Sequence, residues 1–160
     1  MRRTIFVLGL SALVGCGEST TGPGAANLCA TSQGVEVCAP RSEYRPNEVV
    51  SVSVTNETSA TIYIDTCSVK PVGKTSREAA FPVDYSPQNQ CGNDVDVEEI
   101  VANMIELPAG QSIQVTGNIS SFAFQGFYRI NVWVLDVAGA RVSNLPVFSG
   151  TFEVFPSAGT

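Results

Sequence analysis

The densest group of potential metal-binding side chains is a short acidic run in the middle of the chain. Residues 93–99 read Asn-Asp-Val-Asp-Val-Glu-Glu. An extended backbone would place Asp94, Asp96 and Glu98 on one side, where their carboxylates would suit calcium. The run lacks the glycine and the final acid of an EF-hand loop, so calcium is the less favoured interpretation. The favoured one is a solvated loop, or a helix start where acids complement the helix dipole.

Catalytic residues are harder to assign. Glycoside hydrolysis needs two carboxyl groups at a set separation in a cleft, whereas these acids are near neighbours with few aromatic residues close by. The chain contains no histidine, which excludes Ser-His-Asp and Cys-His catalysis and removes the commonest zinc ligand. Ser68-Val69-Lys70 and Lys74-Thr75-Ser76 lack the S-x-x-K spacing of a serine–lysine pair. We therefore expect no catalytic residue, no cofactor and no enzyme activity.

Five cysteines occur, and the first, Cys16, stands apart from the others near the N-terminus. The remaining four, Cys29, Cys38, Cys67 and Cys91, predict two disulfides in an oxidising compartment. Of the three pairings, Cys29–Cys38 and Cys67–Cys91 are favoured because each closes a local loop, worth about 2.7 and about 3.5 kcal/mol. A four-thiolate zinc site is disfavoured because no C-x2–4-C pair occurs. One bridge with two free thiols is the remaining alternative.

The N-terminus has the layout of an export signal. A basic start, Met1-Arg2-Arg3, precedes an apolar stretch from Thr4 to Val14, which is too short to span a bilayer. The segment Leu13-Val14-Gly15-Cys16 that follows resembles the lipobox of bacterial lipoproteins. The resemblance implies removal of residues 1–15 and lipidation of Cys16, with the membrane as a partner through the lipid. Gly17 in place of an aspartate implies the outer membrane, if the cell has two membranes.

Composition and charge characterise the chain that would remain after removal of residues 1–15. Residues 16–27 are small, polar and glycine-rich, which predicts a flexible tether of about 20 Å span. Residues 28–160 suit a single domain. The chain has a net charge of −6 and no basic run, so nucleic acid is not an expected partner.

Period-2 alternation predicts strands along most of this domain. In Tyr128 to Leu135 one face is apolar, and Val50, Val52 and Val54 alternate with polar residues in the same way. Further strands are expected around 35–37, 61–65, 112–116 and 147–155. Near 97–104 the spacing instead fits a short helix that leads into a strand near Ile105. About seven short strands with glycine and proline turns predict an all-β, antiparallel sandwich.

Three short motifs resemble the immunoglobulin-like sandwich of bacterial envelope domains. They are Tyr44-Arg45-Pro46-Asn47-Glu48 before the valine strand, the turn Leu107-Pro108-Ala109-Gly110-Gln111-Ser112, and the strand entry Gly126-Phe127-Tyr128-Arg129-Ile130. The resemblance covers roughly residues 40–155 and implies a corner hydrogen bond from Tyr128. Bacterial intracellular proteinase-inhibitor domains share this layout, but no inhibitory loop can be matched. The antibody Cys–Trp–Cys core is missing, so a fold is implied and a function is not.

The candidate interaction residues flank the strongest strand. Arg129 and Trp133 should point away from its apolar face, and would form a binding patch if that side were open, although packing of Trp133 is favoured. Phe122 and Phe124 lie in the loop before the strand, as a partner contact or a plug of the sandwich.

The sequence therefore predicts a lipid-anchored, non-enzymatic binding or structural module of the cell envelope, with an envelope protein as its possible partner. The alternative is an inhibitor or accessory subunit of an envelope enzyme, acting through residues 70–77 or 121–125. A hydrolase built on the acidic run is less favoured.

Overall fold

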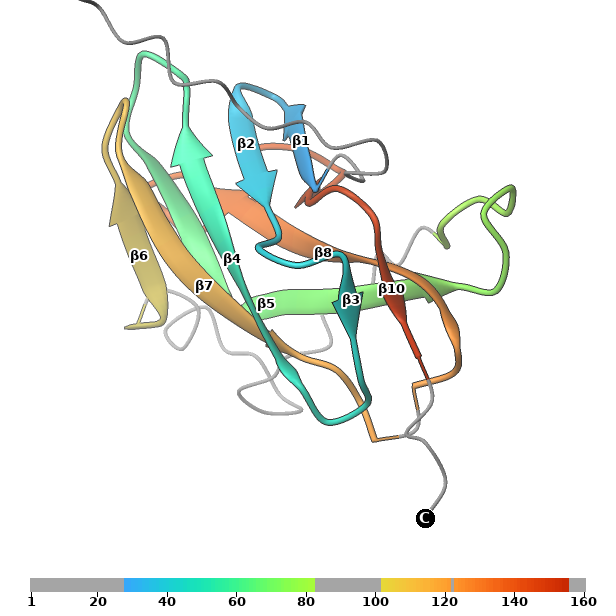
Figure 1. Cartoon of the computed structure of the whole chain (residues 1–160). Coiled ribbons are helices and arrows are strands. Elements are labelled where there is room, and N and C mark those ends of the chain that lie inside the picture. Colours follow the sequence, from blue (N-terminus) through green and yellow to red (C-terminus); the bar gives the residue numbers. More distant parts are fainter. Residues whose placement is uncertain (1–27, 83–101, 122, 156–160) are drawn as a thin grey trace, which may run out of the picture.

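The computed structural model describes residues 28–82, 102–121 and 123–155, which form two packed β-sheets (Figure 1). One sheet has the strand order β1-β2-β4-β7, and the other has β3-β10-β8-β5-β6 with β9 paired to β8. The strands are β1 (Cys29–Ser32), β2 (Val35–Cys38), β3 (Glu43–Tyr44), β4 (Val49–Asn56), β5 (Ile62–Lys74), β6 (Met104–Leu107), β7 (Ser112–Asn118), β8 (Gly126–Leu135), β9 (Val147–Phe148) and β10 (Phe152–Val154). The predicted all-β, immunoglobulin-like sandwich is confirmed.

The core lies between the sheets and follows the predicted alternation. Val50, Val52 and Val54 of β4 are fully buried, while the residues between them are half-buried on the outer face. In β8 the inner residues Ile130 and Val132 are fully buried as well. Strand pairs are antiparallel except β3 with β10, which run parallel. Burying one face of each sheet is what holds two such layers together.

The β1–β2 hairpin contains one expected strand, around residues 35–37, and one that was not expected, β1. Gln33 and Gly34 both have positive φ, of 56° and 72°, as a two-residue type I′ turn requires. The turn aligns Cys29 directly opposite Cys38, and the two form a disulfide. That predicted bridge is confirmed.

Strand β5 is much longer than the five residues expected from its alternation. Its pairing with β8 shifts between Asp65 and Lys70, so the period-2 pattern is interrupted. The Asp65 carboxylate fills this irregularity, accepting hydrogen bonds from the Cys67 amide at 2.9 Å and from the Ser68 hydroxyl. A buried acid thus satisfies backbone and side-chain donors that the ladder leaves unpaired.

The last predicted strand is interrupted, and the predicted helix lies mostly outside the described residues. Ser149 and Gly150 separate β9 from β10, because the Ser149 hydroxyl accepts the Ile130 amide at 2.9 Å in place of a ladder carbonyl. Of the helix predicted near 97–104, positions 97–101 lie outside the described residues, Ala102 is helical, and Met104 already belongs to β6. The strand expected near Ile105 is confirmed.

The corner hydrogen bond implied for Tyr128 is present. Its hydroxyl donates to the Phe124 carbonyl at 3.0 Å, and its ring packs on Phe152 with centroids 6.3 Å apart. Burial raises the pKa of the Tyr128 hydroxyl above its ordinary value. The bond therefore ties the loop before β8 to the strand itself.

Replacing Tyr128 by phenylalanine is expected to lower the free energy of unfolding by about 1 kcal/mol at neutral pH, the net worth of one such bond. In the native protein the hydroxyl ionises above its ordinary pKa, whereas in the unfolded chain it ionises near about pH 10. The unfolded state therefore releases its proton first, and stability falls above about pH 10.

Urea unfolding at pH 7 and pH 10.5 measures both effects. The alkaline loss should be smaller in Tyr128→Phe than in wild type, and Tyr63→Phe on β5 serves as the matched control. Equal alkaline losses in wild type and Tyr128→Phe would contradict the assignment to Tyr128.

Candidate functional site

The open patch considered around Trp133 does not exist, because that side chain is covered. Trp133 does point away from the core, but only 4% of its surface is exposed. The Arg141 guanidinium lies 3.8 Å from the centre of its ring, an arrangement with cation–π character. Trp133 is therefore a packing residue on the outer face of β8, as favoured from the sequence, and not the centre of a surface patch.

Arg129 is also engaged within the protein. Its guanidinium lies 4.5 Å from the Phe81 ring centre and 4.0 Å from that of Phe148. Its Nε atom is buried without a hydrogen-bond partner among the described residues. Burial lowers the pKa of Arg129 from its ordinary value. The two aromatic faces thus replace water around this cation, and Arg129 fastens the segment after β5 to β9.

The two loop segments suggested as contact loops lie side by side. Gly126 begins β8 between them: a side chain there would clash with the Lys74 carbonyl and come within 2.9 Å of the Phe124 ring. Glycine permits this close approach because it has no Cβ. The segment that contains Thr75 and Arg77 therefore adjoins Phe124 and Gln125 at one end of the sandwich.

We call this surface the loop end, and it is defined by its side chains. They are Thr75, Arg77, Phe124, Gln125, Phe127 and Glu153. Phe124 is 45% exposed and packs against Tyr128, with ring centroids 5.3 Å apart. The other aromatic residue of this loop, Phe122, lies outside the described residues. An exposed aromatic ring with one face supported is typical of a contact residue.

A cavity of about 300 Å³ opens at the loop end. Seven residues line it: Thr75, Gln125, Gly126, Phe127, Glu153, Val154 and Phe155. At its margin the Arg77 guanidinium lies 5.0 Å from the Phe127 ring centre and 3.1 Å from a Glu153 carboxylate oxygen. Apolar, cationic and anionic groups thus meet around one hollow.

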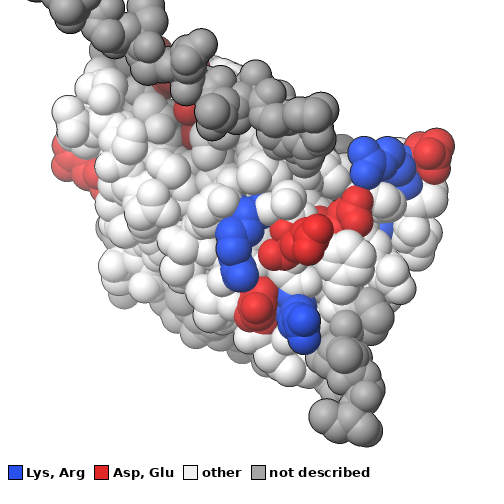
Figure 2. Space-filling model, viewed as in Figure 1, with Lys and Arg blue, Asp and Glu red and all other residues white. Residues whose placement is uncertain are grey.

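The turn that carries Arg77 is held by its own contacts. The Lys74 ammonium donates to the carbonyl oxygens of Arg77 at 2.6 Å and Ala79 at 2.7 Å, and lies 4.6 Å from the Phe81 ring centre. Figure 2 shows charged side chains gathered over β3, β10 and the turn after β5, beside a largely uncharged sheet face. The loop end is therefore a preformed, charged corner of the molecule.

The remaining sequence-derived sites are only partly described. Asp94, Asp96 and Glu98 lie outside the described residues, so the calcium and hydrolase hypotheses stay untested. Cys67 is disulfide-bonded, but Cys91, its predicted partner, lies outside the described residues as well.

No family model matches this chain, and no curated protein matches it either. Within the described ranges, no helix has the length and apolar character needed to cross a membrane.

Proposed function

We propose that this protein is a lipid-anchored binding module of the bacterial cell envelope, and that it engages an envelope protein through the loop end. The observation that carries the proposal is the meeting of two separate loop segments at Gly126. Phe124 lies against Gly126 and Arg77 against Phe127, and both Gly126 and Phe127 line one cavity.

The side chains of the loop end have the composition of a binding surface. Aromatic residues and arginine are enriched at the buried centres of protein interfaces, where a few of them supply most of the affinity. Phe124 is exposed, and the Arg77 side chain, although paired with Glu153, is exposed too. A partner that covers Phe124 would also remove water from the Arg77–Glu153 pair, which strengthens their electrostatic interaction.

Preformed geometry favours binding because little conformational entropy is lost on association. The Lys74 ammonium fixes the turn at Arg77, and the Tyr128 hydroxyl fixes the carbonyl of Phe124. The loop end therefore needs little rearrangement to receive a partner.

The proposed anchor complements this surface. Lipidation at Cys16 and a tether over residues 16–27 would confine the domain to the membrane surface while leaving it free to rotate. Partners in the same membrane would then meet it at a raised effective concentration.

Cross-linking in native envelopes, followed by capture through a tag after Thr160, tests the proposal. Replacing Phe124 by alanine is expected to reduce recovery of a stoichiometric partner by about 30-fold, the effect of losing about 2 kcal/mol at an interface centre. Val137→Ala is the matched control, because Val137 is 74% exposed and follows the C-terminal end of β8, whereas the loop end lies at the start of that strand. Equal recovery by wild type and Phe124→Ala, or recovery of this protein alone, would refute the proposal.

An inhibitor or accessory subunit of an envelope enzyme is the second candidate, and the rigidity of the Lys74–Ala79 turn favours it. Inhibitory loops bind enzymes in a fixed conformation, and here one ammonium group holds two carbonyls of the turn. The same capture experiment separates the two candidates. An inhibitor recovers an enzyme whose activity rises when the Phe124→Ala variant replaces wild type.

A further inference from the structure

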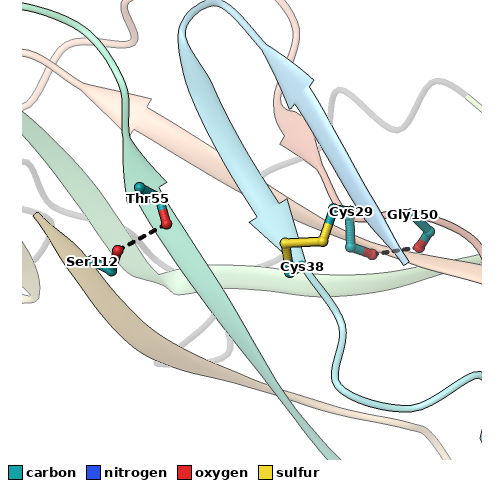
Figure 3. Close-up of a disulfide and its surroundings, with 6 residues drawn as sticks. Cys29, Cys38, Thr55, Ser112 and Gly150 are labelled. Carbon is teal, nitrogen blue, oxygen red and sulfur yellow. Dashed lines mark hydrogen bonds between the residues drawn. A yellow bond between two sulfur atoms is a disulfide. The ribbon is translucent and has the colours of Figure 1, made fainter. Parts of the chain in front are cut away.

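A second group of chemically reactive side chains lies on the outer face of the β1–β2 hairpin, and Figure 3 shows the disulfide that belongs to it. Cys29 and Cys38 are directly opposite each other, and Glu36 precedes Cys38 by two residues, so all three share one face. The two sulfurs and a Glu36 carboxylate oxygen all lie within 4.8 Å of one another. All three residues are half-buried, so solvent can reach them.

The backbone holds this arrangement independently of the disulfide. The Gln33–Gly34 turn and the β1–β2 ladder fix the register, and β2 is paired in turn with β4 from Val35 to Cys38. The Leu28 carbonyl, next to Cys29, accepts the Ala39 amide at 2.9 Å and the Gly150 amide at 3.0 Å. Reduction would therefore leave the two sulfurs opposite each other.

We propose that reduction of this disulfide creates a binding site for a thiophilic divalent cation such as zinc. The ligands are the Cys29 and Cys38 thiolates and the Glu36 carboxylate, with water at the fourth position. Thiolate and carboxylate are accepted zinc ligands, and three protein ligands plus water form an open tetrahedral site. Because a disulfide sulfur carries no thiolate charge, the oxidised protein binds no zinc here.

The chemistry balances with an external dithiol as the reductant. Its two thiols transfer two electrons and two protons, so the Cys29–Cys38 bond breaks to two thiols while the dithiol closes to its own disulfide. The incoming cation then displaces the two thiol protons. The three anionic ligands exceed the cation's charge by one. The residues paired with Glu36 and Cys38 on the neighbouring strands, besides Cys29, are uncharged: Thr31, Thr55 and Ser53.

The experiment uses cobalt(II) as the probe on the whole chain. The protein is reduced with a phosphine, and alkylation with mass spectrometry verifies that Cys29 and Cys38 are free. Reduced wild type should gain a thiolate-to-cobalt charge-transfer band with one equivalent of cobalt, and zinc should displace it. The oxidised protein should show no band.

The variants make the assignment specific. Cys29→Ser should abolish the band, and Glu36→Gln should weaken cobalt binding by about ten-fold or more. Glu106→Gln on β6 is the matched control and should bind as wild type does. No band in the reduced protein, unchanged affinity in Glu36→Gln, or loss of the band in Cys67→Ser would each overturn the proposal, the last because the metal would then sit at other cysteines.

Discussion

Replacing Asn56 by alanine is expected to lower the free energy of unfolding by about 3–5 kcal/mol, a large part of the stability of a domain of this size. Asn56 is fully buried at the end of β4. Removing its amide would leave the buried Leu107 carbonyl without this donor and would break three part-buried bonds to Ala60 and Thr58. The desolvation cost of an unpaired buried group exceeds the net value of the bond itself.

The geometry explains the size of the effect. Asn56 Nδ2 donates to the Ala60 carbonyl at 2.8 Å and to the Leu107 carbonyl at 2.9 Å. Its Oδ1 accepts the Thr58 amide at 3.0 Å and the Thr58 hydroxyl at 2.7 Å. One side chain thus joins β4 of the first sheet to the end of β6 in the second, and also orders the turn between β4 and β5.

Equilibrium denaturation in urea with fluorescence detection measures this change. Asn118→Ala is the matched control, because Asn118 is an exposed asparagine at the end of β7, and its loss should change the free energy by less than about 0.5 kcal/mol. A loss below about 1 kcal/mol in Asn56→Ala would mean that water replaces the amide, and that Asn56 does not couple the sheets.

The inward residues of β4 and β8 were predictable because every second residue along one face of each strand is apolar or aromatic. If one face of a strand is buried, every second residue must be apolar. Val50, Val52 and Val54 meet this condition, and all three are completely buried. The Cys29–Cys38 bridge was predictable for a related reason, since a short loop brings its ends together readily.

Other features depend on contacts that no local pattern encodes. Trp133 is buried, and Arg141 lies over its ring from the loop after β8. The length of β5 was missed because Asp65 satisfies an irregularity that breaks the alternation. Asn56 was noted only as part of a turn, although its amide reaches across to Leu107.

The loop end illustrates the same limit for function. Residues 70–77 and 121–125 were each suggested as contact segments, yet their sequence separation hides that they adjoin. Only the pairing of β5 with β8, in which Lys74 faces Phe127, brings them together. The glycine at position 126 is the one local sign of that close approach.

The second large effect concerns the N-terminus, which we propose to be lipidated. Replacing Cys16 by serine is expected to prevent lipidation. The variant should then either appear in the soluble fraction, if its leader is cleaved, or accumulate as the uncleaved precursor. Serine has no thiol for acylation, and without a lipid the polar tether has no apolar group that binds a bilayer. Each buried methylene of an acyl chain contributes about 0.8 kcal/mol, so several chains anchor a protein firmly while none leaves it free.

Fractionation of whole cells with and without detergent, followed by mass measurement of the N-terminal peptide, makes this test. Gly17→Asp is the matched control in a two-membrane bacterium: it leaves Cys16 intact and should stay with membranes, but shift from the outer to the inner one. Because the described domain begins at Leu28, neither change touches the folded core, so altered partitioning reports the anchor and not stability. A Cys16→Ser protein that remains with membranes after its leader is cleaved would contradict lipidation and move the search for an anchor to the folded domain.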